Sequence, residues 1–367
     1  MNTSYELNTK QIFKGDNNNP LLAPRGVFIK NNMLFVADTA QNRVFIWKKI
    51  PTEMHQAPEV VLGQYQMQHT GRNNEGEVSA SSLLYPSGLW TDGKKLIVAD
   101  AWNHRVLIWN EIPTQNAQPA DIVIGQPDFE SNLPNIKGIS QPPNAKSLYW
   151  CYGVFSDGKR LWIADTGNRR VLFYENIPTQ SFAEADGVIG QNSFEERDYD
   201  PANAVWPYAV KINPQTGQLA IADTQYYRIL LWENWKDAFQ QKAQTLIGQP
   251  NPEQNGMNQF DLFPKANTLS WTYDICFYKT GIWIADTGNS RLLWYVKVPT
   301  QNNQPADDLI GQKNFTTGSE NLDTIRTTEN TLYWAFSIAT DQNTLAIADT
   351  GNHRIILVHL DSSFIIN

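Results

Sequence analysis

Charged side chains that could form ion pairs recur at a fixed spacing along this chain of 367 residues. Aspartate accepts hydrogen bonds from the backbone amides of a turn, and arginine forms a forked pair with a carboxylate. Each of six aspartates is followed five residues later by an arginine, in the pairs Asp38 and Arg43, Asp100 and Arg105, Asp165 and Arg170, Asp223 and Arg228, Asp286 and Arg291, and Asp349 and Arg354. Because a group that occurs once in every repeat is needed by the repeat itself, we interpret these pairs as structural.

The residues that most often bind metals or act as nucleophiles are few and scattered. Cys151 could act as a nucleophile, but the sequence places no histidine to activate its thiol. Two cysteines, Cys151 and Cys276, are too few for a disulfide framework or a cysteine metal cluster, and we expect both thiols to be free. The five histidines, which include no set of three at the spacing of a zinc site, are His55, His69, His104, His353 and His359. The pattern identifies no catalytic residue and predicts no metal and no cofactor.

The six aspartates lie in six copies of one pattern, which consists of an aliphatic run, a tight turn and a second aliphatic run. Aliphatic and β-branched residues at this spacing favour strands. The copies are LFVADTAQNRVFIW (34–47), LIVADAWNHRVLIW (96–109), LWIADTGNRRVLFY (161–174), LAIADTQYYRILLW (219–232), IWIADTGNSRLLWY (282–295) and LAIADTGNHRIILV (345–358). A Gly-Gln motif follows the first five copies, at 61–64, 123–126, 188–191, 246–249 and 309–312. Together with a short run before each copy, these motifs predict four strands per unit.

Four antiparallel strands that repeat radially form a β-propeller. We therefore predict an all-β fold with six blades, each of four antiparallel strands, in a single domain that covers residues 1–367. The last unit lacks a Gly-Gln motif, but KQIFKGD (10–16) is a counterpart of DIVIGQPD (121–128). We expect this N-terminal segment to supply the fourth strand of the last blade, because such a strand closes the ring and covers an otherwise exposed edge.

The VADTxNxR turns resemble the NHL-repeat family, named for its Asn-His-Leu tripeptide, and the resemblance covers essentially the whole chain. It implies a six-bladed NHL propeller of bacterial type with long repeats. The fourth unit departs from the pattern, because Gln225, Tyr226 and Tyr227 replace Gly-Asn-X before Arg228. The resemblance also includes amidating lyases, which hold zinc with several histidines, and lactonases, which hold calcium with carboxylates and amides. The scattered histidines and the single Asp274 of this chain match neither arrangement.

The long connections between units are expected on one face of the propeller, which we call the top. In an up-and-down blade, the turn between the second and third strands lies on the same face as the connection to the next blade. These connections run roughly over 65–85, 127–150, 192–206, 250–271 and 313–334, which is long for ordinary loops and typical of functional ones. The opposite face, the bottom, carries short turns and loops that are similar from blade to blade.

The residues just before each first strand are expected to surround the top mouth of the central channel. Their columns are mostly aromatic, and two members, Arg25 and Asp274, are charged. The predicted ligand-binding residues are Arg25, Tyr85, Trp102, Trp150, Tyr152, Trp206, Tyr208, Tyr226, Trp271, Tyr273, Asp274, Trp334 and Phe336. An aromatic mouth with a few polar groups suits a sugar, a flat ring or an organic cation. The tryptophans could equally pack the long connections onto the propeller body.

Composition restricts the partners of the chain. The net charge of −8 disfavours nucleic acid, because no cluster of lysine or arginine offsets it. No segment has the length of a membrane span or the apolar core of a signal peptide, so the chain is expected to be cytoplasmic or exported with its signal removed. We predict a soluble, monomeric binding or scaffold protein that recognises a small molecule, a sugar or a protein at the top mouth. The alternative is an enzyme of lyase, hydrolase or isomerase type with an unrecognised active site near Asp274 and Arg25.

Overall fold

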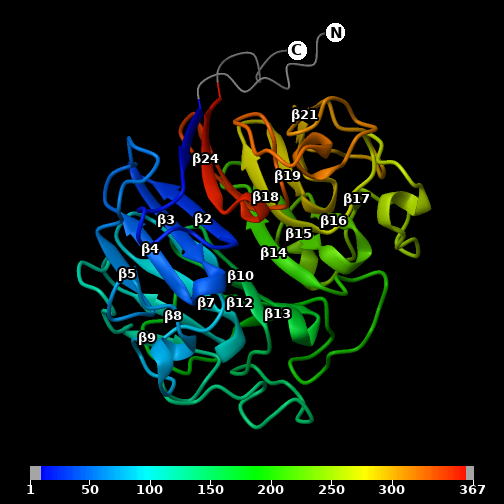
Figure 1. Cartoon of the computed structure of the whole chain (residues 1–367). Helices are drawn as coiled ribbons and strands as arrows, with labels where there is room; N and C mark the ends of the chain where they lie inside the picture. Colours follow the sequence, from blue (N-terminus) through cyan, green and yellow to red (C-terminus); the bar gives the residue numbers. More distant parts are fainter. Residues whose placement is uncertain (1–9, 361–367) are drawn as a thin grey trace.

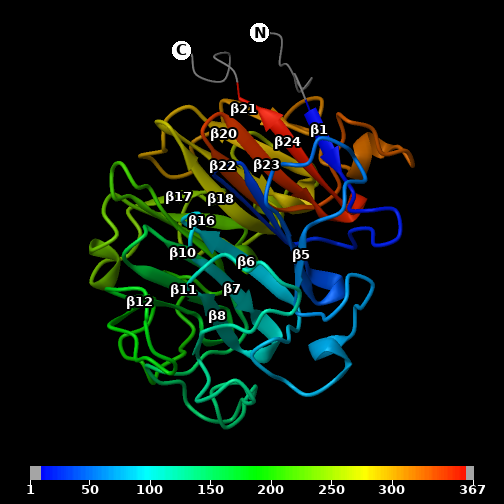
Figure 2. The same ribbon diagram turned by 90° about the vertical axis from the view of Figure 1, so that its left-hand side faces the viewer.

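The computed structural model describes residues 10–360, which form six four-stranded antiparallel sheets arranged as the blades of a propeller (Figures 1 and 2). From the channel outward, the strands are β2 (Gly26–Lys30), β3 (Met33–Asp38), β4 (Arg43–Trp47) and β5 (Val60–Leu62) in blade 1; β6 (Pro86–Thr91), β7 (Leu96–Asp100), β8 (Arg105–Trp109) and β9 (Ile122–Ile124) in blade 2; β10 (Cys151–Ser156), β11 (Leu161–Asp165), β12 (Arg170–Tyr174) and β13 (Gly187–Ile189) in blade 3; β14 (Pro207–Ile212), β15 (Leu219–Asp223), β16 (Arg228–Trp232) and β17 (Thr245–Ile247) in blade 4; β18 (Thr272–Tyr278), β19 (Gly281–Asp286), β20 (Arg291–Tyr295) and β21 (Asp308–Ile310) in blade 5; and β22 (Ala335–Asp341), β23 (Thr344–Asp349), β24 (Arg354–His359) and β1 (Lys10–Phe13) in blade 6.

The innermost strands pack side by side in a closed ring around the central channel, in the order β2, β6, β10, β14, β18 and β22. This arrangement confirms the predicted all-β fold with six blades of four antiparallel strands. The domain predicted for residues 1–367 includes the stretches 1–9 and 361–367, which lie outside the described residues.

Helical structure in the described part of the chain is limited to short 3-10 turns. Those between second and third strands are η1 (Thr39–Gln41), η3 (Ala101–Asn103), η4 (Thr166–Asn168), η5 (Thr224–Tyr226), η8 (Thr287–Asn289) and η10 (Thr350–Asn352). The others are η2 (Arg72–Glu75), η6 (Asp237–Phe239), η7 (Met257–Phe260) and η9 (Glu320–Asp323). None of these turns between residues 10 and 360 has the length and hydropathy that a membrane-crossing helix needs.

Each repeated aspartate ends a second strand, and each repeated arginine begins the third strand opposite it. In blade 2, Nε of Arg105 donates to Asp100 at 2.8 Å, while Nη1 donates to the carbonyl of Phe129 and Nη2 to that of Ser82. Phe129 and Ser82 lie in the connections after and before the blade. One guanidinium therefore fastens two top connections to one hairpin. The Nε–Oδ2 distances of the other Asp–Arg pairs are 2.7–2.9 Å.

The top connections are held by two further repeated groups. Gln126, in a Gly-Gln motif, donates to the carbonyls of His104 and, seven residues further on, of Leu133. Asn168 and Asn135 exchange hydrogen bonds at 2.8 and 3.1 Å between their side-chain amides. The same reciprocal amide pair is formed by Asn103 and Asn73, Asn289 and Asn258, and Asn352 and Asn321. These bonds fix the base of each long connection, so the rim of the top face is built on an ordered frame.

The ring is closed by pairing between the two ends of the described chain. Strand β1 lies antiparallel to β24, with Gln11 opposite Leu357 and Phe13 opposite Ile355. The side chain of Phe13 is buried in the core between blades 1 and 6. Figure 2 shows the blue β1 beside the red β24, although they are far apart in sequence. The predicted closing strand is thus confirmed, and it ends at Phe13 because Lys14 instead donates its amide to the carbonyl of Met54.

Candidate functional site

The top mouth of the channel is shaped by a β-bulge near the start of the innermost strands. The register of β10 shifts between Cys151 and Gly153, and β6, β14, β18 and β22 have a shift at the same place. A bulge gives one strand an extra residue that has no partner in the ladder. In blade 3 this residue is Tyr152, and its counterparts are Tyr208, Tyr273 and Phe336. The bulge therefore turns a column of aromatic residues toward the mouth.

These aromatic side chains contact one another in a closed circuit. We define the mouth ring as Arg25, Tyr85, Tyr152, Tyr208, Tyr273 and Phe336. Tyr152 is stacked on Tyr208, with ring centroids 4.7 Å apart, and Tyr273 is stacked on Phe336 at 4.1 Å. The guanidinium carbon of Arg25 lies 4.2 Å from the ring centroid of Phe336 and completes the circuit. Because the rings stack on each other, their faces are not open slots for a ligand ring.

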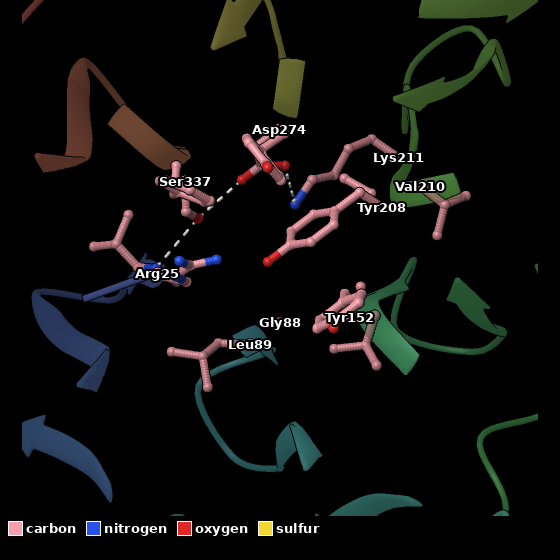
Figure 3. A pocket seen from close by; sticks show the side chains of 15 residues that line it. Arg25, Gly88, Leu89, Tyr152, Tyr208, Val210, Lys211, Asp274 and Ser337 are labelled. Carbon is pink, nitrogen blue, oxygen red and sulfur yellow. Dashed lines mark hydrogen bonds and ion pairs between the residues drawn. The ribbon is translucent and has the colours of Figure 1, made fainter. Parts of the chain in front are cut away.

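A tyrosine hydroxyl of the mouth ring lies toward the charge of Arg25. Tyr208 is 7% exposed. Its hydroxyl, which has no hydrogen-bond partner of good geometry among residues 10–360, points toward the Arg25 guanidinium (Figure 3). Burial raises the pKa of the Tyr208 phenol well above its ordinary value, although nearby Arg25 opposes this. Burial also raises the pKa of Tyr152 to about 12. Both phenols are therefore neutral hydrogen-bond donors near pH 7.

A small cavity lies at the mouth ring. It is lined by Arg25, Tyr152, Tyr208, Tyr273 and Phe336, together with residues of the innermost strands that include Asp274. Its volume of about 30 Å³ is enough for one or two water molecules. The cavity can therefore take the end of a ligand rather than a whole ring.

Asp274 is an acidic residue that lines this cavity, and its oxygens are already engaged. The carboxylate lies 3.3 Å from Nζ of Lys211 and accepts hydrogen bonds from the Ser337 hydroxyl at 2.9 Å and the Ile338 amide at 3.0 Å. Ser337 in turn accepts a hydrogen bond from the amide of Val27. These contacts form a polar chain from blade 4 through blades 5 and 6 to blade 1 (Figure 3).

Lys211 was not predicted as a site residue from the sequence. When the blades are aligned, the residues three positions after Arg25, Ser87, Tyr152, Tyr208, Tyr273 and Phe336 are Phe28, Trp90, Phe155, Lys211, Cys276 and Ala339. Lys211 is the single charged residue in this column. A charge in an otherwise apolar or small column is a signal that could have identified it. The same alignment already contained Asp274, so the pair could have been inferred from two neighbouring blades.

The remaining predicted site residues lie around the mouth ring or away from it. Trp102 is stacked on Tyr85, with centroids 4.4 Å apart, and donates its indole N–H to the Tyr152 hydroxyl. Tyr226 lies elsewhere, against Arg228, with its hydroxyl on that of Tyr199. The four tryptophans pack on neighbouring aromatic residues, in the pairs Trp150 and Trp206, Trp271 and Tyr227, and Trp334 and Tyr333. Trp271 and Trp334 remain 41% and 43% exposed and form an outer rim.

The histidine and cysteine residues form no metal site in the structure between residues 10 and 360, where no three potential ligands of this kind cluster. Both cysteines are free, as predicted, and Cys151 is buried. His104 and His353 connect blades: Nδ1 of His104 accepts the amide of Trp150, and Nδ1 of His353 accepts that of Ala23. Burial lowers the pKa of His104 to about 4, so it is the neutral acceptor that this contact needs.

Six four-stranded blades around a central channel define the class of this protein as a six-bladed β-propeller. Among solved structures, the chain is similar to a hydrazine synthase of Kuenenia stuttgartiensis, with a TM-score of 0.52 and 10% sequence identity over 93% of this chain and 97% of that chain. At this identity the similarity shows the fold alone. No family model matches the chain, and no curated protein matches it.

Proposed function

We propose that this chain is a binding protein of NHL-repeat type whose mouth ring receives the acidic end of an organic ligand. The observation that carries the proposal is the Arg25 guanidinium, which takes part in none of the ion pairs found between residues 10 and 360. Its neighbours are instead the rings of Phe336 and Tyr85. A carboxylate would provide the forked partner that arginine prefers, in surroundings where the charge has lost part of its hydration.

The NHL assignment is supported by what the residues of the repeated turn do. The aspartate and arginine bind each other, and the asparagine between them holds a top connection, as Asp165, Arg170 and Asn168 do in blade 3. Each of these polar residues has a structural partner within the propeller, and this explains why the motif recurs in the blades. It also leaves the unrepeated residues of the channel for recognition.

The shape of the mouth favours a ligand with a narrow acidic end. The cavity of about 30 Å³ has room for a carboxylate, and the neutral hydroxyl of Tyr208 can donate to it beside Arg25. The body of the ligand would remain outside, among exposed aromatic residues of the rim such as Trp271 and Trp334. A sugar acid or an aromatic acid has this form.

The proposal is tested by calorimetric titration with two matched pairs of compounds, benzoate with benzamide and glucuronate with glucose. We expect an acid to bind and its uncharged counterpart to bind at least tenfold more weakly. Arg25→Met is expected to weaken binding of the acid at least tenfold, and Arg25→Lys to restore part of it. The control is Arg326→Met, which removes an exposed arginine from a top connection. Equal affinity for both members of each pair, or binding unchanged in Arg25→Met, contradicts the proposal.

No second function is proposed for the mouth. The alternative was an enzyme with an unrecognised active site near Asp274 and Arg25, and the Asp274 carboxylate is already bound by Lys211, Ser337 and Ile338. The observed contacts therefore favour binding over acid–base chemistry at this residue.

A further inference from the structure

A larger cavity occupies the bottom end of the channel. Its volume is about 430 Å³, against about 30 Å³ at the mouth ring. The sequence predicts short and similar turns and loops on the bottom face, and no site was expected there. Residues of the short bottom turns, such as Asp92, Gly158 and Pro214, border this cavity together with the ends of the innermost strands. A volume of this size is within the range of small-molecule sites.

The wall of the bottom cavity has two unlike halves. Blades 1 to 3 contribute the aromatic residues Phe28, Trp90 and Phe155. The same column in blades 5 and 6 contains Cys276 and Ala339, and Phe277, next to Cys276, borders the cavity on that half. Small side chains opposite large rings leave open space in front of the rings. The wall therefore suits a flat, largely apolar molecule that stacks on the aromatic half.

Polar groups also line the bottom cavity. Lys211 borders both this cavity and the one at the mouth, so its ion pair with Asp274 lies between them. An ammonium group has three donors, and the contact with Asp274 uses one of them. On the small half of the wall, Sγ of Cys276 lies 3.2 Å from the hydroxyl of Thr340. These groups can bind a hydrogen-bond acceptor on one end of a flat ligand.

We propose that the bottom cavity is a second binding site, which takes a flat aromatic molecule whose carbonyl or similar acceptor contacts Lys211. The arguments are the volume of the cavity, the aromatic half of its wall and the spare donors of the ammonium group. The site does not depend on the acid site proposed at the mouth, because the two cavities share Lys211 but no other lining residue.

The experiment uses 2-naphthamide, an uncharged flat amide that has no acidic end for Arg25. Calorimetric titration of the full chain is expected to show one molecule bound. Ala339→Phe, which fills the small half of the wall, is expected to weaken binding at least tenfold, and Lys211→Met to weaken it several-fold. Arg25→Met is the matched control and is expected to leave the affinity unchanged.

A second measurement is independent of whether Ala339→Phe folds. Cys276 lines the bottom cavity and is partly exposed, whereas Cys151 is buried, so Cys276 reports on the site in the unmodified protein. We expect 2-naphthamide to slow the reaction of Cys276 with 5,5′-dithiobis(2-nitrobenzoate) at least threefold, and Cys276→Ser to abolish that reaction. No binding of 2-naphthamide, or binding that leaves the Cys276 rate unchanged, overturns the proposal. Binding lost in Arg25→Met but kept in Ala339→Phe would also overturn it, and would place the compound at the mouth.

Discussion

Two kinds of buried carboxylate in this propeller form ion pairs, one kind within a blade and the other between blades. Asp165 is fully buried and binds Arg170 within one hairpin, and the same pair is present in every blade. Asp274 is 6% exposed and binds Lys211 of the preceding blade and Ser337 of the following one, and no other blade has this pair. The repeated carboxylate therefore holds a blade together, whereas the unrepeated one connects neighbouring blades where they meet at the channel.

The residues in the position of Asp274 show why such a connection is absent from blades 1 to 3. Glycine stands there, and a Cβ on Gly153 would lie 2.4 Å from the carbonyl oxygen of Tyr208 in the next blade. A Cβ on Gly88 would lie 2.6 Å from the carbonyl oxygen of Tyr152. On this side of the channel backbone packs on backbone, and on the other side a carboxylate bridges the blades.

The largest effect is expected for the repeated carboxylate. Asp165→Ala leaves the guanidinium of Arg170 buried without its partner, which costs on the order of 3–5 kcal/mol of the free energy of unfolding. Urea unfolding followed by tryptophan fluorescence measures the loss. The control is Asp261→Ala, whose ion pair with Lys265 is exposed and contributes less than about 1 kcal/mol. An equal loss of the free energy of unfolding in the two variants would contradict the structural role of the repeated pair.

The next effect concerns a repeated position that different side chains fill. His104 accepts the amide of Trp150, and Asn42 does the same for Tyr85 in blade 1. Because the pKa of His104 is lowered to about 4, the unfolded chain binds its proton more readily between pH 6.5 and 4. The stability that this contact gives is therefore complete above pH 6.5 and is lost as the pH falls toward 4.

His104→Asn copies the arrangement of blade 1 and removes the titrating group. Between pH 7 and pH 4, wild type is expected to lose roughly 3 kcal/mol more of its free energy of unfolding than this variant does. Urea unfolding at both pH values provides the comparison. His359→Asn, at an exposed histidine in the last strand, is the control and is expected to follow wild type. Parallel losses in wild type and His104→Asn would show that His104 does not titrate in this range.

A smaller effect is expected for the unrepeated carboxylate. Asp274→Asn keeps an acceptor for the Ser337 hydroxyl but removes the charge beside Lys211, which costs about 1–3 kcal/mol. The same unfolding measurement applies. A loss as large as that of Asp165→Ala would mean that the two carboxylates are equivalent for the fold, which would end the distinction between them.

The smallest effect on stability is expected at the mouth. Arg25→Met removes a cation that contacts rings and forms no ion pair with any residue between 10 and 360, so the free energy of unfolding is expected to fall by less than about 1 kcal/mol. Thermal melting is sufficient to detect a larger change. If Arg25→Met destabilises the chain as much as Asp274→Asn does, the guanidinium mainly stabilises the fold, and the proposal that it recognises a ligand is contradicted.

The fold could be predicted from the sequence because its determinants are local. The apolar runs, the turn residues and pairs such as Asp165 and Arg170 lie within a few positions of each other, and the missing Gly-Gln motif indicated the closing strand. Sequence columns also brought Tyr152 and Tyr208 to the same mouth, where they are in contact.

The rest of the candidate site depends on geometry that spacing does not contain. The bulge in β10 interrupts the alternation of the strand, so that both Tyr152 and Gly153 line the cavity at the mouth. The partner of Asp274 lies in another blade, more than sixty residues away at Lys211. The bottom cavity arises from the summed volumes of side chains from all six blades, for which no single motif is a signal.

The pairing of β1 with β24 has a consequence for the timing of folding during synthesis. The ribosome makes Lys10–Phe13 long before Arg354–His359, because the remaining strands of all six blades lie between them in the chain. At about 5–20 residues per second, the first strand waits roughly 15–70 s for its partner. During that time five blades can form their own sheets, while the apolar residues between blades 1 and 6, Phe13 among them, still lack the surface that covers them. A chaperone that shields these residues on the nascent chain would act at the interface between blades 1 and 6 rather than on every blade.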